Sequence, residues 1–248
     1  MTRSSFKRRA IFFASLTGGL LFSGIAWAQT TMDLTQLVDR GLTGPLKILA
    51  LLTILSLLPA IVLTMTSFTR AIIVLAFVRT GIGSMQTPPT QVIVGIALFL
   101  TMFTMAPVTS QIITDAYNPY VAGEIDENTT YERATAPLRA FMLRQTREAD
   151  LALFYNAARL PFPKTEQEVP MHIAIPAFVI SELTTAFQMG VLVLLPFLLV
   201  DIAVASTLMS MGMMMVPPTS ISLPLKLLLF VVVDGWHMLT DSLLRSFL

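Results

Sequence analysis

The stretch IPAFVISELTTAFQMGVLVLLPFLLV, Ile175 to Val200, decides the fold. A helix needs about 20 mostly apolar residues to cross the hydrocarbon core of a bilayer, and this stretch is longer than that. Its single charged residue is Glu182, and it contains Pro196 near its end. Because interior prolines are tolerated in membrane helices whose neighbours satisfy the freed carbonyls, the stretch predicts a kinked transmembrane helix.

The rest of the chain has the same apolar character. Of its 248 residues, 54% are hydrophobic and 12% are charged, and the mean hydropathy is +0.74. An ordinary soluble domain is about 25% charged. Three further apolar segments run from about Leu46 to Met65, Val92 to Ile113 and Leu223 to Leu239, each with a proline inside or near its start. We therefore predict an all-α membrane protein built of kinked helical hairpins.

Composition and motifs also exclude several classes of function. The net charge of +1 gives no electrostatic basis for nucleic-acid binding. The absence of cysteine excludes disulfides, thiolate metal sites and cysteine nucleophiles. His172 and His237 have no neighbouring ligands at metal spacing, and Asp201 and Asp234 lack the glycine framework of an aspartyl pair. We find no phosphate-loop or nucleophile-elbow motif, and we predict no catalytic residue, metal or cofactor.

The N-terminus has the pattern of a secretory signal peptide. MTRSSFKRR is basic, an apolar run follows from Ala10, and the run ends in the A-x-A sequence Ala26-Trp27-Ala28. Residues 1–28 are predicted to be removed, which leaves a mature chain from Gln29. An uncleaved first membrane helix is the alternative.

Charge in the connections predicts the topology. A loop is expected between the apolar segments Leu46–Met65 and Val92–Ile113. It carries Arg70 and Arg79 and no acid, so it is predicted to face the cytoplasm. Residues 114–172 form the one polar stretch, with nine acids and six bases, and are predicted to lie outside, in the periplasm of a Gram-negative cell. Within this stretch, the spacing of apolar residues predicts an amphipathic helix from Pro137 to Leu160.

Four charged residues fall in or at the ends of the apolar spans: Glu182, Asp201, Lys226 and Asp234. Charges at such positions usually face a bundle interior or a cavity. One hypothesis is structural pairing across helices or subunits, for example between Glu182 and Lys226. The other is a relay for protons or ions.

The segment LMSMGMMMVPP, Leu208 to Pro218, contains Met209, Met211, Met213, Met214 and Met215. Core packing and a Cu(I) site are the simpler hypotheses. A Cu(I) site would usually include Cys or His ligands, and none is near. Three consecutive methionines on a helix would point to three different sides, and Pro217-Pro218 prevent the helix from continuing. We therefore predict a loop of soft apolar side chains, which could form a constriction if it were repeated around an axis.

Two long blocks resemble a known family, the P subunit of the flagellar type III protein export gate (FliP) and its injectisome counterparts. They are PAIVLTMTSFTRAIIVLAFVRTGIGSMQTPPTQV, residues 59–92, followed by FLTMFTMAPV, residues 99–108, and the region FVISELTTAFQMGVLVLLPFLLVDIAVASTLMSMGMMMVPPTSISLPLKLLLFVVVDGW, residues 178–236. The resemblance covers nearly the whole mature chain.

The resemblance implies a core subunit of a protein-conducting channel in the bacterial inner membrane, within the flagellar basal body and partly exposed to the periplasm. About five copies would join Q and R subunits in a helical, ring-like assembly, with A and B subunits completing the gate and unfolded flagellar proteins as substrates. The methionine loop would be the pore gasket. Glu182, Asp201, Lys226 and Asp234 would be charged positions in the membrane, with subunit contacts among their roles.

The predicted organisation is therefore a signal peptide at 1–28, a first hydrophobic hairpin at 29–113, a polar periplasmic segment at 114–172 and a second hydrophobic hairpin at 173–248. Three alternatives stay open at this point. One is an injectisome export-gate subunit, one is a methionine-lined metal or small-molecule transporter, and one is an assembly scaffold whose pore is lined by another subunit.

Overall fold

The structure is a computed structural model that describes residues 44–83, 87–213 and 215–247. The predicted signal peptide lies outside the described residues, as does Met214. The chain divides into two units, residues 1–59 and 60–248. Every regular element in the described ranges is a helix, which confirms the all-α prediction.

The described part of the first unit belongs to helix α2 (Gly44–Met65). The unit ends at Pro59, which lies inside that helix and has no N–H to donate to the helical ladder. Large apolar side chains of this unit are exposed: Ile48, Leu49, Leu52, Leu55, Leu57 and Leu58.

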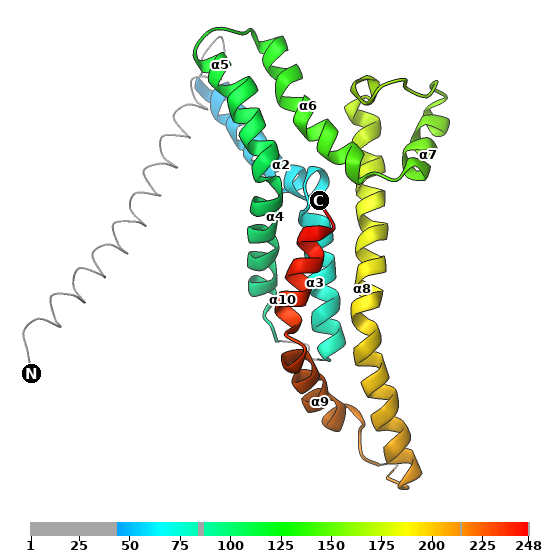
Figure 1. The fold of residues 1–248 in the computed structure, drawn as a ribbon. Coiled ribbons are helices and arrows are strands. Elements are labelled where there is room, and N and C mark those ends of the chain that lie inside the picture. The colour runs from blue at the N-terminus through cyan, green and yellow to red at the C-terminus, as the bar shows by residue number, and fades with distance from the viewer. Residues whose placement is uncertain (1–43, 84–86, 214, 248) are drawn as a thin grey trace, which may run out of the picture. The chain divides into compact units, whose positions relative to one another are not determined.

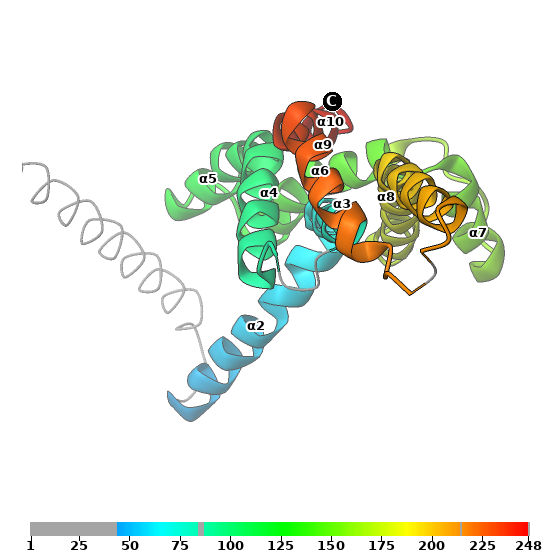
Figure 2. The same ribbon diagram turned by 90° about the horizontal axis from the view of Figure 1, so that it is seen from below.

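The second unit is built on two helices that pack along each other, α3 (Phe68–Ile82) and α8 (Met171–Ser210). Helix α4 (Thr90–Ile112) packs on the other side of α3, so α3 lies between α4 and α8 in both views (Figures 1 and 2). Helix α9 (Thr219–Val232) turns back along α8, and α10 (Gly235–Arg245) follows after a bend of 63°.

Close contact between α3 and α8 depends on two glycines. A methyl group on Gly190 of α8 would lie 2.3 Å from the Phe77 ring of α3, and one on Gly81 of α3 would lie 2.5 Å from the Phe197 ring of α8. Phe77 also meets Phe187 edge-on at 5.3 Å. The two helices can therefore approach because each places a glycine beneath an aromatic ring of the other.

The polar part of the unit starts where α4 continues through a π-helical turn, η1 (Ile113–Tyr117), into α5 (Asn118–Val121). Pro119 has no N–H for the carbonyl of Asp115, and the Arg133 side chain donates to that carbonyl instead. Helices α6 (Glu127–Gln145) and α7 (Glu148–Ala158) and the 3₁₀ turn η2 (Glu166–Glu168) complete this part.

The amphipathic helix predicted at Pro137–Leu160 is two helices in the structure. Helix α6 starts earlier because Asp126 caps it, accepting a hydrogen bond from the Thr129 N–H at 3.2 Å. The break after Gln145 exists because the Arg147 N–H leaves the helical ladder and donates to Ser181 Oγ on α8 at 3.0 Å. Long-range packing, which local periodicity does not report, therefore ends the helix.

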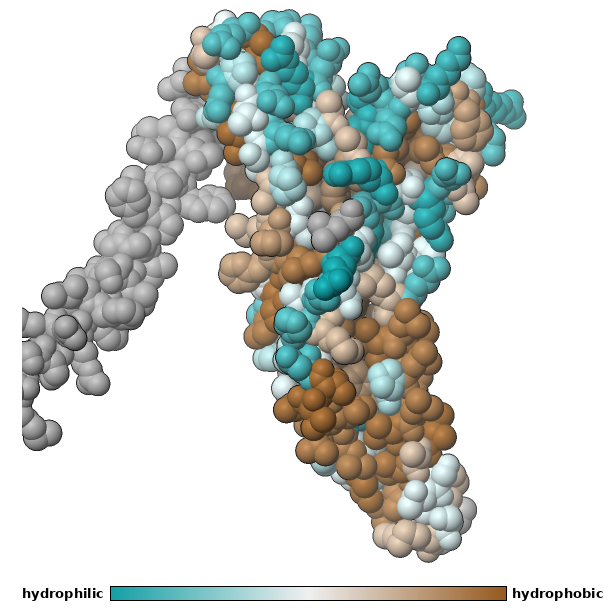
Figure 3. Space-filling model, in the orientation of Figure 1, coloured by the Kyte–Doolittle hydropathy of each residue, from teal (hydrophilic) through white to brown (hydrophobic). Residues whose placement is uncertain are grey.

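Two helical stretches are long and apolar enough to cross a membrane, residues 90–121 and α8. The number rises to four if the bent pairs within residues 51–82 and 219–245 each count as one span. Hydrophilic residues gather over the α5–α7 end of the second unit, and hydrophobic ones over the α8–α9 end (Figure 3). The described part of the chain is thus all-helical, with helices long and apolar enough to span a membrane.

Candidate functional site: an exposed methionine loop and buried charge pairs

The methionine-rich segment forms the turn between α8 and α9. Helix α8 continues ten residues past Val200, the end of the apolar stretch identified in the sequence, and stops at Ser210. The Met213 N–H donates to the Leu208 carbonyl and the Gly212 N–H to the Met209 carbonyl, both at 3.0 Å. This pair of bonds is a Schellman motif, which requires the left-handed φ of +75° that Gly212 adopts. Met209 is therefore in the last helical turn, and Met211, Met213 and Met215 follow in the loop.

The methionine side chains of this loop are exposed. The exposed fraction is 61% for Met209 and 96% for Met215. Met211 and Met213 are exposed as well. The described methionines are thus not core filler within this chain, and their soft thioether side chains are free to contact other molecules.

The apolar surface continues from the loop along both helices of the hairpin (Figure 3). On α8 the exposed large side chains include Leu192, Leu195, Leu198, Leu199 and Ile202. On α9 they include Leu225, Leu228, Val231 and Val232. Lipid or other protein has to cover this surface.

Arg70 and Glu182 form a buried ion pair between α3 and α8. Their side chains are 2% and 0% exposed. Arg70 Nε donates to Glu182 Oε2 at 2.9 Å, and Nη2 donates to Oε1. The prediction that Arg70 lies in a loop is wrong: it is in the first turn of α3, where Glu182 neutralises it. Arg79, predicted for the same loop, is in the last turn of α3, where Nη1 donates to Thr90 Oγ1 at 2.9 Å.

Lys226 pairs with Asp201, not with Glu182. Its Nζ lies 2.6 Å from Asp201 Oδ2, and the two side chains are 7% and 39% exposed. The predicted pairing of Glu182 with Lys226 is therefore wrong for the described chain. Because α9 runs back along α8 from the turn between them, Lys226 lies only about 10 Å from that turn along its helix. Glu182 lies about 40 Å from the same turn along α8, so the two side chains cannot meet.

Asp234 occupies the bend between α9 and α10. Its φ of 51° and ψ of 54° are left-handed, and its side chain does not cap α10. The residue is exposed, between Val233 and the buried Gly235. It bends the chain, and the next glycine lets α10 pack against Phe230, whose ring would lie 2.3 Å from a methyl group at position 235.

A polar network fixes α7 to α8 beside the buried ion pair. Ser181 Oγ donates to Asp150 Oδ2 at 2.6 Å, and Arg147 Nε donates to the same oxygen at 2.8 Å. Nearby, burial raises the pKa of Tyr155, and the Glu168 carboxylate adds to the shift. These contacts connect the polar helices to a membrane-length helix.

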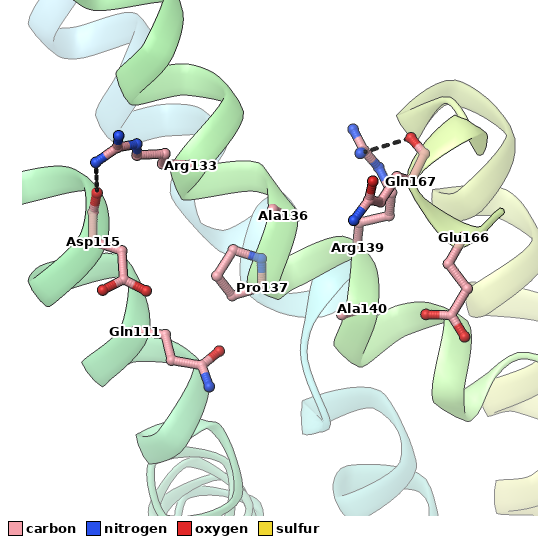
Figure 4. A pocket seen from close by; sticks show the side chains of 9 residues that line it. All are labelled: Gln111, Asp115, Arg133, Ala136, Pro137, Arg139, Ala140, Glu166 and Gln167. Carbon is pink, nitrogen blue, oxygen red and sulfur yellow. Dashed lines mark hydrogen bonds between the residues drawn. The ribbon is translucent and has the colours of Figure 1, made fainter. Parts of the chain in front are cut away.

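A groove of about 410 Å³ lies between the end of α4 with η1, α6 and η2 (Figure 4). Ala136, Pro137 and Ala140 line it with small side chains, and Arg133 and Arg139 stand on either side. Arg139 Nη1 donates to the Gln167 carbonyl at 3.1 Å. The groove is also lined by Asp115 and Glu166, but Arg133 donates to the backbone carbonyl of Asp115 and not to its carboxylate.

Within the described ranges, no cluster of three or more His, Asp or Glu residues could hold a metal ion. Sequence reasoning missed that Arg70 is a core residue. The signal was its position directly before the apolar run AIIVLAFV, Ala71 to Val78, because a cation that begins such a run needs an anionic partner inside the bundle.

The comparisons with known proteins agree with one another. A sequence model described as the FliP family matches residues 51–243. The flagellar biosynthetic protein FliP of Pectobacterium carotovorum is 51% identical over 92% of this chain and 90% of its own length. The protein of that name from Bacillus subtilis is 50% identical over 84% and 94%, and the one from Aquifex aeolicus is 41% identical over 97% and 99%.

These matches cover both apolar regions and the polar segment between them, and the matched helices are long enough to enter a membrane. The chain belongs to the FliP family and is a membrane-embedded component of the flagellar export apparatus.

Proposed function

We propose that this chain is a core subunit of the channel in the flagellar type III export gate. Several copies would surround one axis and conduct unfolded flagellar proteins across the inner membrane. The observation that carries the proposal is the exposed methionine loop between α8 and α9, with Met215 96% exposed. In a single chain this loop would leave apolar side chains without a partner.

The length of α8 supports an assembly of several chains. With 40 residues it is about 60 Å long, roughly twice the thickness of a hydrocarbon core. Its exposed large apolar side chains extend from Ile180 to Met209, a span of about 44 Å. Since this exceeds the apolar thickness of a bilayer of about 30 Å, protein as well as lipid has to cover the helix. Neighbouring copies and related gate subunits are the proposed cover.

The methionine loop has the chemistry of a deformable seal. An unfolded chain carries side chains of every kind, so a rigid polar filter would either block it or leak ions. A collar of flexible apolar thioethers yields to a passing chain and closes behind it, and an apolar constriction stops ions by dewetting. The proposed gasket consists of Met209, Met211, Met213, Met214 and Met215.

Membership of the family supports the proposed partners and location. These are the Q and R subunits in the same ring-like assembly, the A and B subunits of the gate, and unfolded flagellar proteins as substrates. Residues 1–28 are proposed as a cleaved signal peptide, which would place Gln29 on the periplasmic side. The polar residues 114–172 are proposed to face the periplasm, between hydrophobic hairpins at 29–113 and 173–248. No cofactor is proposed.

The test is the native mass of the detergent-solubilised complex. The chain is expressed alone and then together with the Q and R subunits. A closed multimer of about five copies that gains further subunits on co-expression is the expected result. A stable monomer or dimer under both conditions would refute the channel proposal, because a gasket needs several loops around one axis.

A further inference from the structure

The Arg70 guanidinium uses all five of its N–H donors, and Ser246, which follows α10, accepts two of these hydrogen bonds. Nε and one Nη2 donor bind Glu182, and the second Nη2 donor binds Gln145 Oε1 at 3.0 Å. Nη1 donates to the Ser246 carbonyl at 2.7 Å and to Ser246 Oγ at 3.0 Å. An arginine has five donors in a fixed planar fork, so the guanidinium is fully satisfied only when all three partner residues are in place.

The following residue covers the face of the same guanidinium. The ring of Phe247 lies 4.0 Å from Arg70 Cζ, within the range of a cation–π contact. Its other neighbours hold it there: it stacks on Phe141 at 6.4 Å, and Gln145 Nε2 donates to its carbonyl at 3.3 Å. Residues 246 and 247 thus supply acceptors at one edge of the cation and an aromatic cover over its plane.

The contacts of this tail join parts that are far apart in sequence. Arg70 belongs to α3, Gln145 ends α6, Glu182 is in α8, and the tail follows α10. Without the tail, two donors of a buried cation lose their acceptors and one face of its plane is uncovered. A buried charge that loses partners costs far more than a surface one, because it cannot recover its hydration.

We propose that Ser246 and Phe247 form a lid that seals the Arg70–Glu182 pair. The second unit then reaches its fully packed form only when the end of α10 has docked on α3, α6 and α8. This is a conformational device built into the fold. It is independent of the proposed channel function, since it concerns contacts within one chain.

The test is a double-mutant cycle on the full chain in detergent, at fixed protein concentration. A chain that stops after Arg245 is compared with the chain that continues to Leu248 in two backgrounds, the natural pair and Arg70→Met/Glu182→Leu, in which this pair carries no charge. Denaturant unfolding gives the folded-to-unfolded ratio. With the natural pair, truncation is expected to lower this ratio by about a hundredfold, since two hydrogen bonds to a charged group are lost. In the neutral background the loss is expected to be at least tenfold smaller.

An equal loss in both backgrounds would overturn the lid, because apolar packing of Phe247 on Phe141 does not depend on the charge. Should the neutral background fail to fold, single substitutions decide instead. Phe247→Tyr keeps an aromatic face over Arg70 and is expected to keep the natural ratio, whereas Phe247→Leu keeps only apolar volume and is expected to lower it about fivefold. Indistinguishable Tyr and Leu variants would contradict the lid. Arg245→Ala is the matched control, because Arg245 pairs with Asp241 on the surface and is expected to change little.

Discussion

In folded proteins charged side chains are usually exposed and apolar ones buried. The buried pair of Arg70 and Glu182 departs from the first half of this rule, and the methionine loop after Ser210 departs from the second. In one region two charges are inside, with every donor of the cation satisfied by its own chain. In the other, apolar side chains are outside, and Met215 is almost fully exposed. The buried charges hold this chain together, whereas the exposed methionines leave a surface for other molecules. Substitutions in the first region should therefore change the folding of the chain, and those in the second should change only what the assembly does.

The largest loss of stability is expected from breaking the buried pair. Glu182→Leu leaves Arg70 without its counter-ion and should lower the free energy of unfolding by about 3–5 kcal/mol. Arg70→Met should cost about as much, and the double variant less than either single one. Denaturant unfolding in detergent measures all three. If the losses of the single variants simply added up in the double variant, the two residues would not act as a pair.

A smaller loss is expected from the glycine contacts between α3 and α8. In Gly190→Ala the new methyl group would press on the ring of Phe77, so we expect a loss of about 1–3 kcal/mol in the same measurement. Gly95→Ala on α4 is the matched control, since nothing lies within 4 Å of the added methyl group. A Gly190→Ala chain as stable as the control would show that α3 and α8 do not pack as closely as described.

The second ion pair should matter less than the first, since Asp201 is 39% exposed. Lys226→Met is expected to cost about 1 kcal/mol. Reversing both charges in Asp201→Lys/Lys226→Asp should restore most of what either reversal loses, whereas reversing Glu182 together with Lys226 should restore nothing. If reversing Glu182 and Lys226 restored stability and reversing Asp201 and Lys226 did not, Lys226 would pair with Glu182, as expected from the sequence.

The smallest effect concerns the start of α6. Hydrogen bonds from the Thr129 hydroxyl and N–H hold the pKa of Asp126 below its ordinary value of 3.8. The ionised cap therefore supports the helix fully above that value and loses its effect as the pH falls through the lowered pKa. Amide exchange in the first turn of α6 should accelerate on acidification. Asp126→Asn keeps a capping acceptor that does not titrate, and it should abolish this particular pH dependence. If amide exchange in the Asp126→Asn variant kept the same pH dependence, groups other than Asp126 would be its cause.

Local sequence signals predicted the membrane helices because apolar length is a property of one segment. They failed for α3, since two arginines without nearby acids look like a cytoplasmic loop, and the partner of Arg70 is 112 residues away. The position of the turn could have corrected the predicted partner of Lys226. In a hairpin that turns at residues 211–218, Asp201 and Lys226 lie at similar distances from the turn. Glu182 is much farther from the turn and lies level with the end of α10. Apolar periodicity predicted a helix in the polar segment and missed its break, because Ser181 on α8 causes it.

We propose that the exposed methionine loop seals a pore, and the ion permeability of the membrane reports whether it does. Met213, Met214 and Met215 are replaced together by alanine in the complete gate, and Met102→Ala, an exposed methionine on α4, is the control. We predict that the triple variant assembles with an unchanged native mass and makes the membrane leaky to ions, while the control stays tight. A correctly assembled triple variant with natural permeability would show that these methionines do not seal the pore.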